Sequence, residues 1–248
     1  MPRYKLKICY DGTGYHGFQR QSTGPTVQKA IEEALLPFEG APISIFGASR
    51  TDSGVHAKGQ VAHFDLSTPR STEGLLKGLN SRLAKDIRIL EVVECSPTFH
   101  ARFDAKRKIY SYRLTLTPWQ SPFLRFNALH YPYSLNMDQI DVAIQILKGR
   151  HDFLSFSNTT SPNDRPPCTI KEIFDIKYEK RDEMLSFFFE GDGFLYNMVR
   201  NLMGALIEVG KNKLSIDDLI SILKNKPMPR KFTTMPAHPL CLDEIFYD

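Results

Sequence analysis

The chain is organised around residues 43–64, Ile43-Ser44-Ile45-Phe46-Gly47-Ala48-Ser49-Arg50-Thr51-Asp52-Ser53-Gly54-Val55-His56-Ala57-Lys58-Gly59-Gln60-Val61-Ala62-His63-Phe64. The two ends of this stretch, residues 43–46 and 61–64, are short apolar runs that are typical of β-strands. The segment between them is too polar and too rich in small residues to form a buried helix or a central strand. We therefore expect a loop that a sheet holds at both ends, which is a common setting for binding and catalytic side chains.

Two side chains of opposite charge lie close together in this loop. Arg50 and Asp52 are separated by a single residue. Taken alone, the sequence Asp-Ser-Gly favours an ordinary turn in which the Asp52 side chain caps its own backbone. A catalytic role for Asp52 therefore needs support from other parts of the chain.

The apolar periodicity predicts the same order of elements in both halves of the chain, strand-helix-strand-strand-helix-strand. In the first half we expect strands at 4–10, 43–46, 61–64 and 87–94, and helices at about 27–38 and 72–84. In the second half we expect strands at 109–116, 170–178, 184–189 and 240–247, a helix that Asn136 caps, and a helix at 194–209 with Gly210 at the C′ position. An additional helix is expected to begin at Ser215.

This order predicts an α+β fold of two tandem ferredoxin-like (βαββαβ, RRM-like) halves. The halves are expected to comprise residues 1–105 and 106–248, and to share a mixed, mainly antiparallel sheet with helices on one side. The natural place for a site is then a central cleft between the halves.

Composition excludes several classes of protein. The 248 residues are 42% hydrophobic and 24% charged, as in a soluble globular protein. No apolar run approaches the roughly 20 residues that span a bilayer, and the N-terminus lacks a signal-peptide core. The four cysteines form no Cys-x-x-Cys pair and the seven histidines show no metal-ligand spacing, so we expect a cytoplasmic protein without a disulfide framework or a metal site.

Basic and aromatic residues are mixed in residues 99–113. The stretch contains the cations Arg102, Lys106, Arg107, Lys108 and Arg113 and the rings Phe99, Phe103, Tyr110 and Tyr112, against the single acid Asp104. Cations neutralise phosphates and rings stack on bases, so the stretch suits a nucleic-acid surface. The alternative is an ordinary strand with a solvated charged face.

A third place of interest is residues 193–201, at the start of a largely apolar predicted helix. Arg200 is flanked there by Met198-Val199 and Leu202-Met203, which are core positions. Its side chain could extend to solvent or cap a carbonyl. Alternatively, it pairs with a carboxylate from another element, because a buried guanidinium without an anion would be costly.

Five motifs in order resemble the tRNA pseudouridine synthase A (TruA) family. They are Tyr10-Asp11-Gly12-Thr13-Gly14-Tyr15-His16-Gly17-Phe18-Gln19-Arg20-Gln21, Thr26-Val27-Gln28, Arg50-Thr51-Asp52-Ser53-Gly54-Val55-His56-Ala57, Phe99-His100-Ala101-Arg102-Phe103 and Met198-Val199-Arg200-Asn201. The resemblance extends from about residue 4 to the last strand. Small departures occur at Phe18, Ser49 and Ser53, and none removes a charged or hydroxyl group that the chemistry needs.

The resemblance implies an isomerisation in which a uridine of a tRNA is detached at its glycosidic nitrogen, turned and reattached through carbon. Asp52 would be the catalytic nucleophile, and Arg200 would pair with it. Tyr110 would stack on or hydrogen-bond the target base, and Arg50 would help to hold the nucleotide out of its stack. No cofactor is implied, because no atoms are gained or lost.

The resemblance also implies the partners: tRNA, modified on the 3′ side of the anticodon stem-loop, and a second copy of the chain in a homodimer.

The residues alone leave two rival functions open. A non-catalytic RRM-like RNA-binding protein would carry an aromatic-glycine consensus that is absent here. A glycoside or nucleoside hydrolase would need a second acid, for which Asp104 is the nearest candidate.

The polar segment 158–168, with Arg165, Pro166 and Pro167, is expected to be a mobile loop, and no role is assigned to it.

Overall fold

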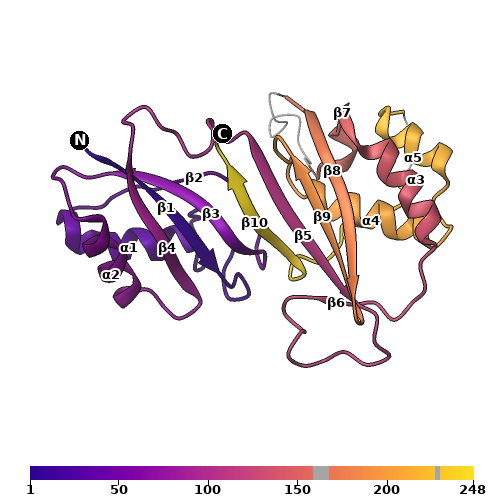
Figure 1. The fold of residues 1–248 in the computed structure, drawn as a ribbon, viewed down its shortest axis with the longest axis horizontal. Coiled ribbons are helices and arrows are strands. Elements are labelled where there is room, and N and C mark those ends of the chain that lie inside the picture. The colour runs from indigo at the N-terminus through magenta and orange to yellow at the C-terminus, as the bar shows by residue number, and fades with distance from the viewer. Residues whose placement is uncertain (159–167, 227–229) are drawn as a thin grey trace. The chain divides into compact units, whose positions relative to one another are not determined.

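A computed structural model describes residues 1–158, 168–226 and 230–248 (Figure 1). Arg165, Pro166 and Pro167, in the segment that we expect to be a mobile loop, lie outside the described residues. The chain divides into two compact units. The first unit comprises Met1–Lys106 together with Cys241–Asp248, and the second comprises Arg107–Leu240.

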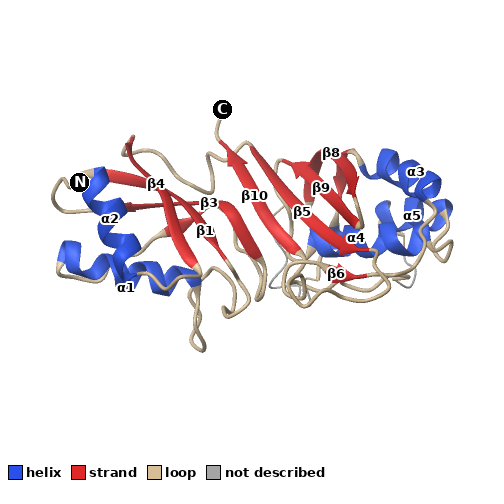
Figure 2. Cartoon of the chain, turned by 60° about the horizontal axis from the view of Figure 1, so that its bottom comes forward, coloured by secondary structure: helices blue, strands red, loops and turns tan. Residues whose placement is uncertain are grey.

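The first unit is a sheet with two helices on one face (Figure 2). Its elements are β1 (Arg3–Tyr10), α1 (Val27–Glu39), β2 (Phe46–Gly47), β3 (His56–Asp65), α2 (Thr72–Arg82), β4 (Ile87–Cys95) and the last strand β10 (Leu240–Phe246). Strand β1 lies between β4 and β3 and is antiparallel to both. The short β2 pairs antiparallel with one end of β3, and β10 pairs parallel with the other end through Cys241 and Leu242.

Alternating side chains explain why β1 forms the centre of this sheet. Tyr4, Leu6, Ile8 and Tyr10 are buried, while the residues between them are partly exposed. The helices begin at hydroxyl caps, because the side chains of Thr26 and Ser71 each accept a backbone N–H from three residues further on. The core of the unit therefore lies between one face of the sheet and the two helices.

The second unit contains a mainly antiparallel sheet in the order β5-β9-β8-β7. Its elements are β5 (Arg107–Thr115), β6 (Leu129–His130), α3 (Met137–Leu147), β7 (Gly149–Asp152), the 3₁₀ helix η1 (Leu154–Phe156), β8 (Ile170–Arg181), β9 (Met184–Gly191), α4 (Met198–Gly210) and α5 (Ile216–Leu223). Phe187 and Phe189 of β9 are fully buried, as are Leu202 and Leu206 of α4. Helix α3 packs beside α5 (Figure 1).

The α+β class and most predicted elements are confirmed, including the helix that Asn136 caps through the Gln139 N–H. The expected strand at 43–46 is shorter, because ladder pairing with β3 is limited to Phe46 and Gly47. The start of β3 at His56 shortens the expected loop. The short strands β6 and β7 were not predicted, because two to four residues are too few to show a period.

Two details of α4 differ from the prediction. The helix begins at Met198 rather than at residue 194, because Asn197 adopts a left-handed conformation with φ of 59° and interrupts the helical path. Gly210 is the last helical residue and does not occupy the C′ position. A β-carbon there would lie 2.8 Å from Ile140 Cδ1, so this glycine allows α4 to approach α3 closely.

We expect the last strand in the second half of the chain, whereas the structure groups Cys241–Asp248 with the first unit. Pairing with β3 explains this placement. None of the helices in the described part of the chain is long and apolar enough to cross a membrane.

Candidate active site

The loop that carries Arg50 and Asp52 connects β2 to β3 in the first unit. The amide side chain of Gln60, which is fully buried, fixes the start of this loop. Its Nε2 donates to the Ser49 carbonyl at 2.7 Å, and its Oε1 accepts the Ser49 N–H at 3.1 Å. Ser49 therefore has a defined backbone position at the start of the loop.

Thr51 and Asp52 form the centre of the loop. The Thr51 side chain is buried and its Oγ1 lies 2.7 Å from the Tyr10 hydroxyl. The Val55 N–H donates to the Asp52 carbonyl at 3.1 Å, which closes a turn over Ser53 and Gly54. The turn suggested by Asp-Ser-Gly is thus present in the backbone, with the Asp52 residue half-buried at its first position.

The loop after β1 holds the Asp52 loop from the other side. The Phe18 N–H donates to the Thr51 carbonyl at 3.1 Å, and the Tyr15 carbonyl accepts from Ser53 Oγ at 3.2 Å and from the Gly54 N–H at 3.3 Å. Gly17 has a φ of 89°, and a β-carbon on it would lie 2.6 Å from the Thr51 carbonyl oxygen. The motif at residues 10–21 is therefore the framework that positions Asp52.

Arg50 is exposed at the start of this loop. Partial burial lowers its pKa, and the nearby guanidinium of Arg102 lowers the pKa further. An arginine stays positively charged after shifts of this kind. Arg50 is therefore an accessible cation two residues before Asp52.

Tyr110 lies in β5 of the second unit, opposite Phe189 of β9. It is 6% exposed, and its ring makes a T-shaped contact with the Phe194 ring at a centroid distance of 5.3 Å. Phe194 belongs to the segment before α4, so Tyr110 lies near the beginning of that helix. Tyr112 is two residues further on and fully buried, and its hydroxyl donates to the Pro236 carbonyl at 3.0 Å.

Arg200 lies in the first turn of α4 and is half-buried. Its Nε donates to the Met235 carbonyl at 2.6 Å, and its Nη1 donates to Asn197 Oδ1 at 2.7 Å. Burial raises the pKa of Tyr112, and the positive charge of Arg200 opposes part of that increase. Of the alternatives for Arg200, the capping of a carbonyl is confirmed, and the pairing with a carboxylate stays a prediction.

Several supporting residues were missed by sequence reasoning. Asn201 is fully buried next to Arg200, and its Nδ2 donates to the Phe156 carbonyl at 2.7 Å while its Oδ1 accepts from Thr234 Oγ1 at 2.7 Å. Gly204 allows the Thr233 carbonyl to approach α4, because a β-carbon would lie 2.2 Å from that oxygen. These contacts hold residues 233–235 against the helix and fix the Arg200 partner Met235. The feature of the sequence that could have indicated these contacts is the polar pair Arg200-Asn201 in an otherwise apolar helix.

The residues of the basic stretch at 99–113 differ in burial and in ion pairing. Arg107 pairs with Glu190 at 2.6 Å, and Lys108 and Tyr112 are buried. Tyr112 is therefore unsuited to stacking on a base. Asp104 accepts the His100 N–H at 2.8 Å, which makes it part of a local turn. It offers no support for the hydrolase alternative.

The predicted site residues are divided between the units. Asp52 and Arg50 belong to the first unit, and Tyr110 and Arg200 belong to the second. That they come together in one cleft stays a prediction. Within residues 1–158, 168–226 and 230–248, no group of three or more His, Cys, Asp or Glu side chains could hold a metal ion.

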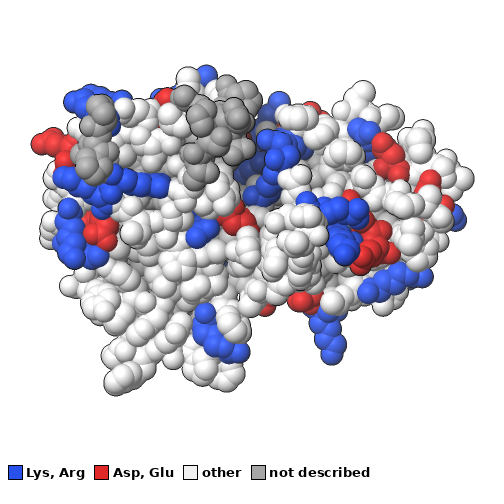
Figure 3. Space-filling view, turned by 180° about the vertical axis from the view of Figure 1, so that it is seen from behind, with Lys and Arg blue, Asp and Glu red and all other residues white. Residues whose placement is uncertain are grey.

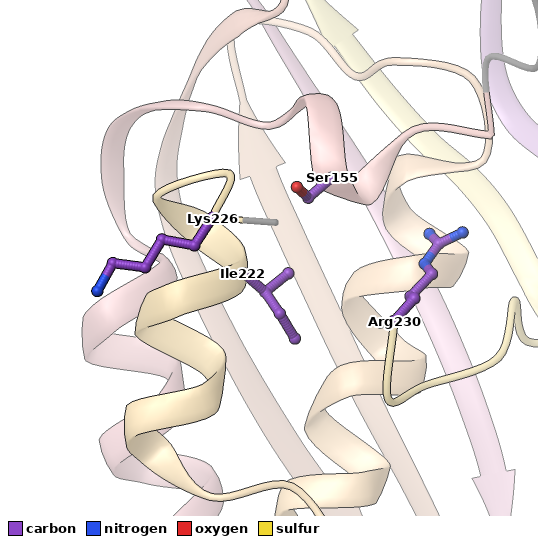
Figure 4. A pocket seen from close by; sticks show the side chains of 4 residues that line it. All are labelled: Ser155, Ile222, Lys226 and Arg230. Carbon is purple, nitrogen blue, oxygen red and sulfur yellow. The ribbon is translucent and has the colours of Figure 1, made fainter. Parts of the chain in front are cut away.

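A separate pocket in the second unit is lined by Ser155, Ile222, Lys226 and Arg230 (Figure 4). The side chain of Lys226 points away from Arg230, and the Arg230 guanidinium donates to Asn158 Oδ1 at 2.6 Å. The four described residues that line this pocket include none of the predicted site residues. The pocket is therefore a poor candidate for the active site.

Comparisons with known proteins give the family. The family model described as tRNA pseudouridine synthase matches residues 8–104 and 143–248. The chain is 39% identical over 249 residues to a tRNA pseudouridine synthase A from Streptococcus uberis, covering 100% of this chain and 99% of that protein. It is 40% identical over 248 residues to the protein of the same name from a Geobacillus species, covering 99% and 98% of the two chains.

The two matched segments contain all five motifs, with Asp52 in the first and Arg200 in the second, while Tyr110 lies between them. The full-length similarity and the order of the motifs agree with each other. The chain therefore belongs to the tRNA pseudouridine synthase A family, a family of isomerases.

Proposed function

We propose that this chain converts uridine to pseudouridine on the 3′ side of the anticodon stem-loop of tRNAs, with Asp52 as the catalytic nucleophile. The observation that carries the proposal is the framework around Asp52. Thr51, the residue before Asp52, is held by three contacts: the Phe18 N–H donates to its carbonyl, its Oγ1 shares a hydrogen bond with the Tyr10 hydroxyl, and Gly17 approaches it closely. A carboxylate held by a rigid framework is the arrangement that nucleophilic catalysis needs.

Arg200 is the proposed partner of Asp52. Met235 and Asn197 accept two of its N–H groups and thereby fix the plane of the guanidinium. A guanidinium in a fixed plane binds a carboxylate with defined geometry and keeps it charged. Arg200 would then orient Asp52, while Asp52 itself would attack the substrate.

Tyr110 and Arg50 are proposed to bind the target nucleotide. The Tyr110 ring is 6% exposed and is held by an edge-to-face contact with Phe194, so the small part of it that is accessible has a fixed position for contact with the uracil. Arg50 is exposed and carries a charge that can bind the phosphate of an extruded nucleotide. Extruding a base costs a few kcal/mol, which such contacts must offset.

A second copy of the chain is the proposed protein partner, in a cytoplasmic homodimer. The support is one short segment of the second unit that carries exposed rings, of which Trp119 is 85% exposed and Phe123 is 89% exposed. Isolated apolar residues are common on surfaces, whereas contiguous exposed apolar area often marks an interface. Changing both residues to serine should convert a dimer into a monomer in light scattering.

The finer architecture also stays a proposal. In chain order, β1, α1, β2, β3, α2 and β4 follow the βαββαβ pattern, and β5, α3, β8, β9, α4 and β10 follow it again when the short elements are left aside. This order supports two ferredoxin-like halves. The active site would then lie in a central cleft between them.

The decisive experiment compares Asp52→Asn with the wild type on unmodified tRNA transcripts. We expect no pseudouridine in the variant, with tRNA affinity within a few-fold, because the side chain keeps its size and loses its charge. Asp217→Asn is the matched control, since Asp217 is exposed in the first turn of α5. Full activity of Asp52→Asn would refute the role of Asp52, and tRNA binding without pseudouridine in the wild type would favour the RRM-like alternative.

The pairing of Asp52 with Arg200 has its own test. Arg200→Met should impair turnover more than binding, whereas equal loss in both would indicate a packing role. The stabilities of Asp52→Ala, Arg200→Met and the double variant should be non-additive if the two side chains pair. Additivity within about 0.5 kcal/mol would contradict the pairing.

A further inference from the structure

We propose that Phe46, Arg50, His100, Arg102 and Phe103 form an RNA-contact surface on the first unit, which we call the arginine–aromatic surface. Arg102 would bind a backbone phosphate and Phe103 would stack on an unpaired base next to the nucleotide that reacts. This inference rests on the proposed function and assigns roles to residues beyond the four predicted site residues.

The turn that carries Arg102 and Phe103 is fixed by hydrogen bonds to its backbone. His100 Nδ1 accepts the N–H groups of Arg102 and Phe103 at 3.1 and 3.3 Å, and Asp104 Oδ2 accepts the His100 N–H at 2.8 Å. The Ala101 N–H donates to His63 Nδ1 at 3.2 Å. With its polar backbone groups bonded inwards, the turn presents its two side chains outwards without much loss of conformational freedom on binding.

The aromatic part of the surface is a row of three rings. The His100 ring lies between Phe103, at a centroid distance of 4.3 Å, and Phe46, at 6.1 Å. Phe103 is 74% exposed and Phe46 is 52% exposed. A fixed row of accessible rings is the kind of platform on which successive bases stack.

The charged part of the surface is a pair of arginines. Arg50 and Arg102 are both exposed, and they are near enough for the charge of Arg102 to lower the pKa of Arg50. Within the part of the chain that the structure describes, neither guanidinium is paired with a carboxylate, and Arg102 lies over the Phe103 ring at 5.8 Å. Two like charges at one place repel each other, and a bound phosphate would remove that repulsion.

The chemistry of the surface indicates RNA rather than an acidic protein. Cations next to exposed rings match a phosphate next to an unstacked base, and an acidic peptide would leave the rings unused. Several of the basic side chains on the face in Figure 3 have acidic side chains beside them. Arg50 and Arg102 have no such neighbour paired with them among the described residues, so their charge is available to a phosphate.

The test uses full-length Arg102→Gln and Phe103→Ala with an unmodified tRNA transcript. We expect each variant to bind tRNA about tenfold more weakly and to show a raised KM with kcat nearly unchanged. Arg102→Gln should also reduce the slope of log Kd against the logarithm of the salt concentration, by the amount expected for the loss of about one phosphate contact. Phe103→Leu, which keeps apolar area without the aromatic ring, should restore little of the affinity.

Arg82→Gln is the matched control, because Arg82 lies over the Phe38 ring at 5.4 Å on the helical side of the same unit. Its affinity should equal that of the wild type, and unchanged thermal midpoints in all variants would show that the fold is intact. Wild-type affinity and KM in both surface variants, in an enzyme that forms pseudouridine, would overturn this inference and leave the proposed function standing. Displacement of tRNA by polyglutamate at equal charge would also overturn it, in favour of an acidic protein partner. Absence of pseudouridine in the wild type would instead refute the proposed function.

Discussion

Tyr110 shows how one residue can be fixed by packing and still be assigned a chemical role. Its ring has an edge contact with Phe194, and its strand position opposite Phe189 sets its direction. Neither contact needs the hydroxyl group. The ring and the hydroxyl can therefore be separated by a single substitution.

Tyr110→Phe keeps the ring contact with Phe194 and removes only the hydroxyl, so its thermal midpoint is measured beside its activity to separate a structural effect from a chemical one. The resemblance also makes the hydroxyl a candidate for removing the proton from the ring carbon after the base is reattached. If it has this role, turnover should fall by about 10² to 10⁴. Single-turnover rates and tRNA affinity measured side by side give the answer. An unchanged rate would leave Tyr110 with a stacking role alone.

His63 gives the first unit a pH-dependent stability. It is 2% exposed in β3, where burial, Arg3 and His100 lower its pKa to about 4, and Asp65 opposes the shift. The neutral ring is therefore favoured in the folded state, whereas the unfolded chain takes up a proton near the ordinary value of about 6.5. Its contribution is fully present above about pH 6.5 and is lost as the pH falls towards 4.

We expect the free energy of unfolding to decrease by on the order of 2–3 kcal/mol between pH 7 and pH 4.5 because of this group. His63→Gln keeps an acceptor for the Ala101 N–H and removes the titration, so its urea midpoint should change less over the same range. Equal pH dependence in the two proteins would show that other groups account for the effect.

At the scale of elements, the loop after β1 and the loop before β3 act as one structure. The carbonyls of Thr51 and Tyr15 accept N–H groups across the contact, and two glycines allow the backbones to approach. Gly12 is one of them, since a β-carbon there would lie 2.0 Å from the Val55 carbonyl oxygen. The family motif at the N-terminus is thus explained by its contact with the Asp52 loop, rather than by a direct part in the reaction.

Gly17→Ala should displace the Asp52 loop, because the new methyl group would meet the Thr51 carbonyl and because φ is 89° at this position. We expect a loss of stability of about 1–3 kcal/mol and a larger fractional loss in kcat than in tRNA affinity. Gly14→Ala is the control, since nothing lies within 4 Å of a β-carbon there. Similar behaviour of the two variants would argue against this account of Gly17.

Some elements could be predicted from sequence and others could not, for physical reasons. The alternation in β1 and the Asn136 cap are local signals, and both were read correctly. The role of Gly210 depends on Ile140 from another helix, which no local pattern reveals. In the same way, the Tyr112 hydroxyl donates to the Pro236 carbonyl, which is 124 residues away in the chain, and no local pattern reveals this partner. Motif resemblance supplied Asp52 and Arg200, whereas Asn197 and Met235 needed coordinates.

At the scale of the whole molecule, the first unit is built from both ends of the sequence. β10 pairs with β3, the Tyr247 hydroxyl donates to the Ala101 carbonyl at 2.8 Å, and the Phe246 carbonyl accepts the Lys106 N–H at 2.9 Å. The last eight residues therefore stabilise the part of the chain that carries Asp52 and the arginine–aromatic surface.

Removing residues 241–248 should destabilise the first unit, although the deletion is far from it in sequence. Hydrogen exchange should become faster in β3 and around Ala101, because their partners are lost. The exchange rates of β8 and β9 should change less, because these strands belong to the second unit. Tyr247→Phe is a milder variant that removes one hydrogen bond, at a cost of about 1 kcal/mol. Unchanged exchange in β3 after the deletion would contradict this role of β10.

The return of the chain to β3 has a consequence for synthesis on the ribosome. Residues 1–106 emerge first, yet the strand that completes their sheet is translated only after the whole second unit. Until β10 has emerged, one edge of β3 lacks its parallel neighbour and is open to pairing with other chains. Prematurely terminated products of this gene should therefore be more prone to aggregation than the finished protein.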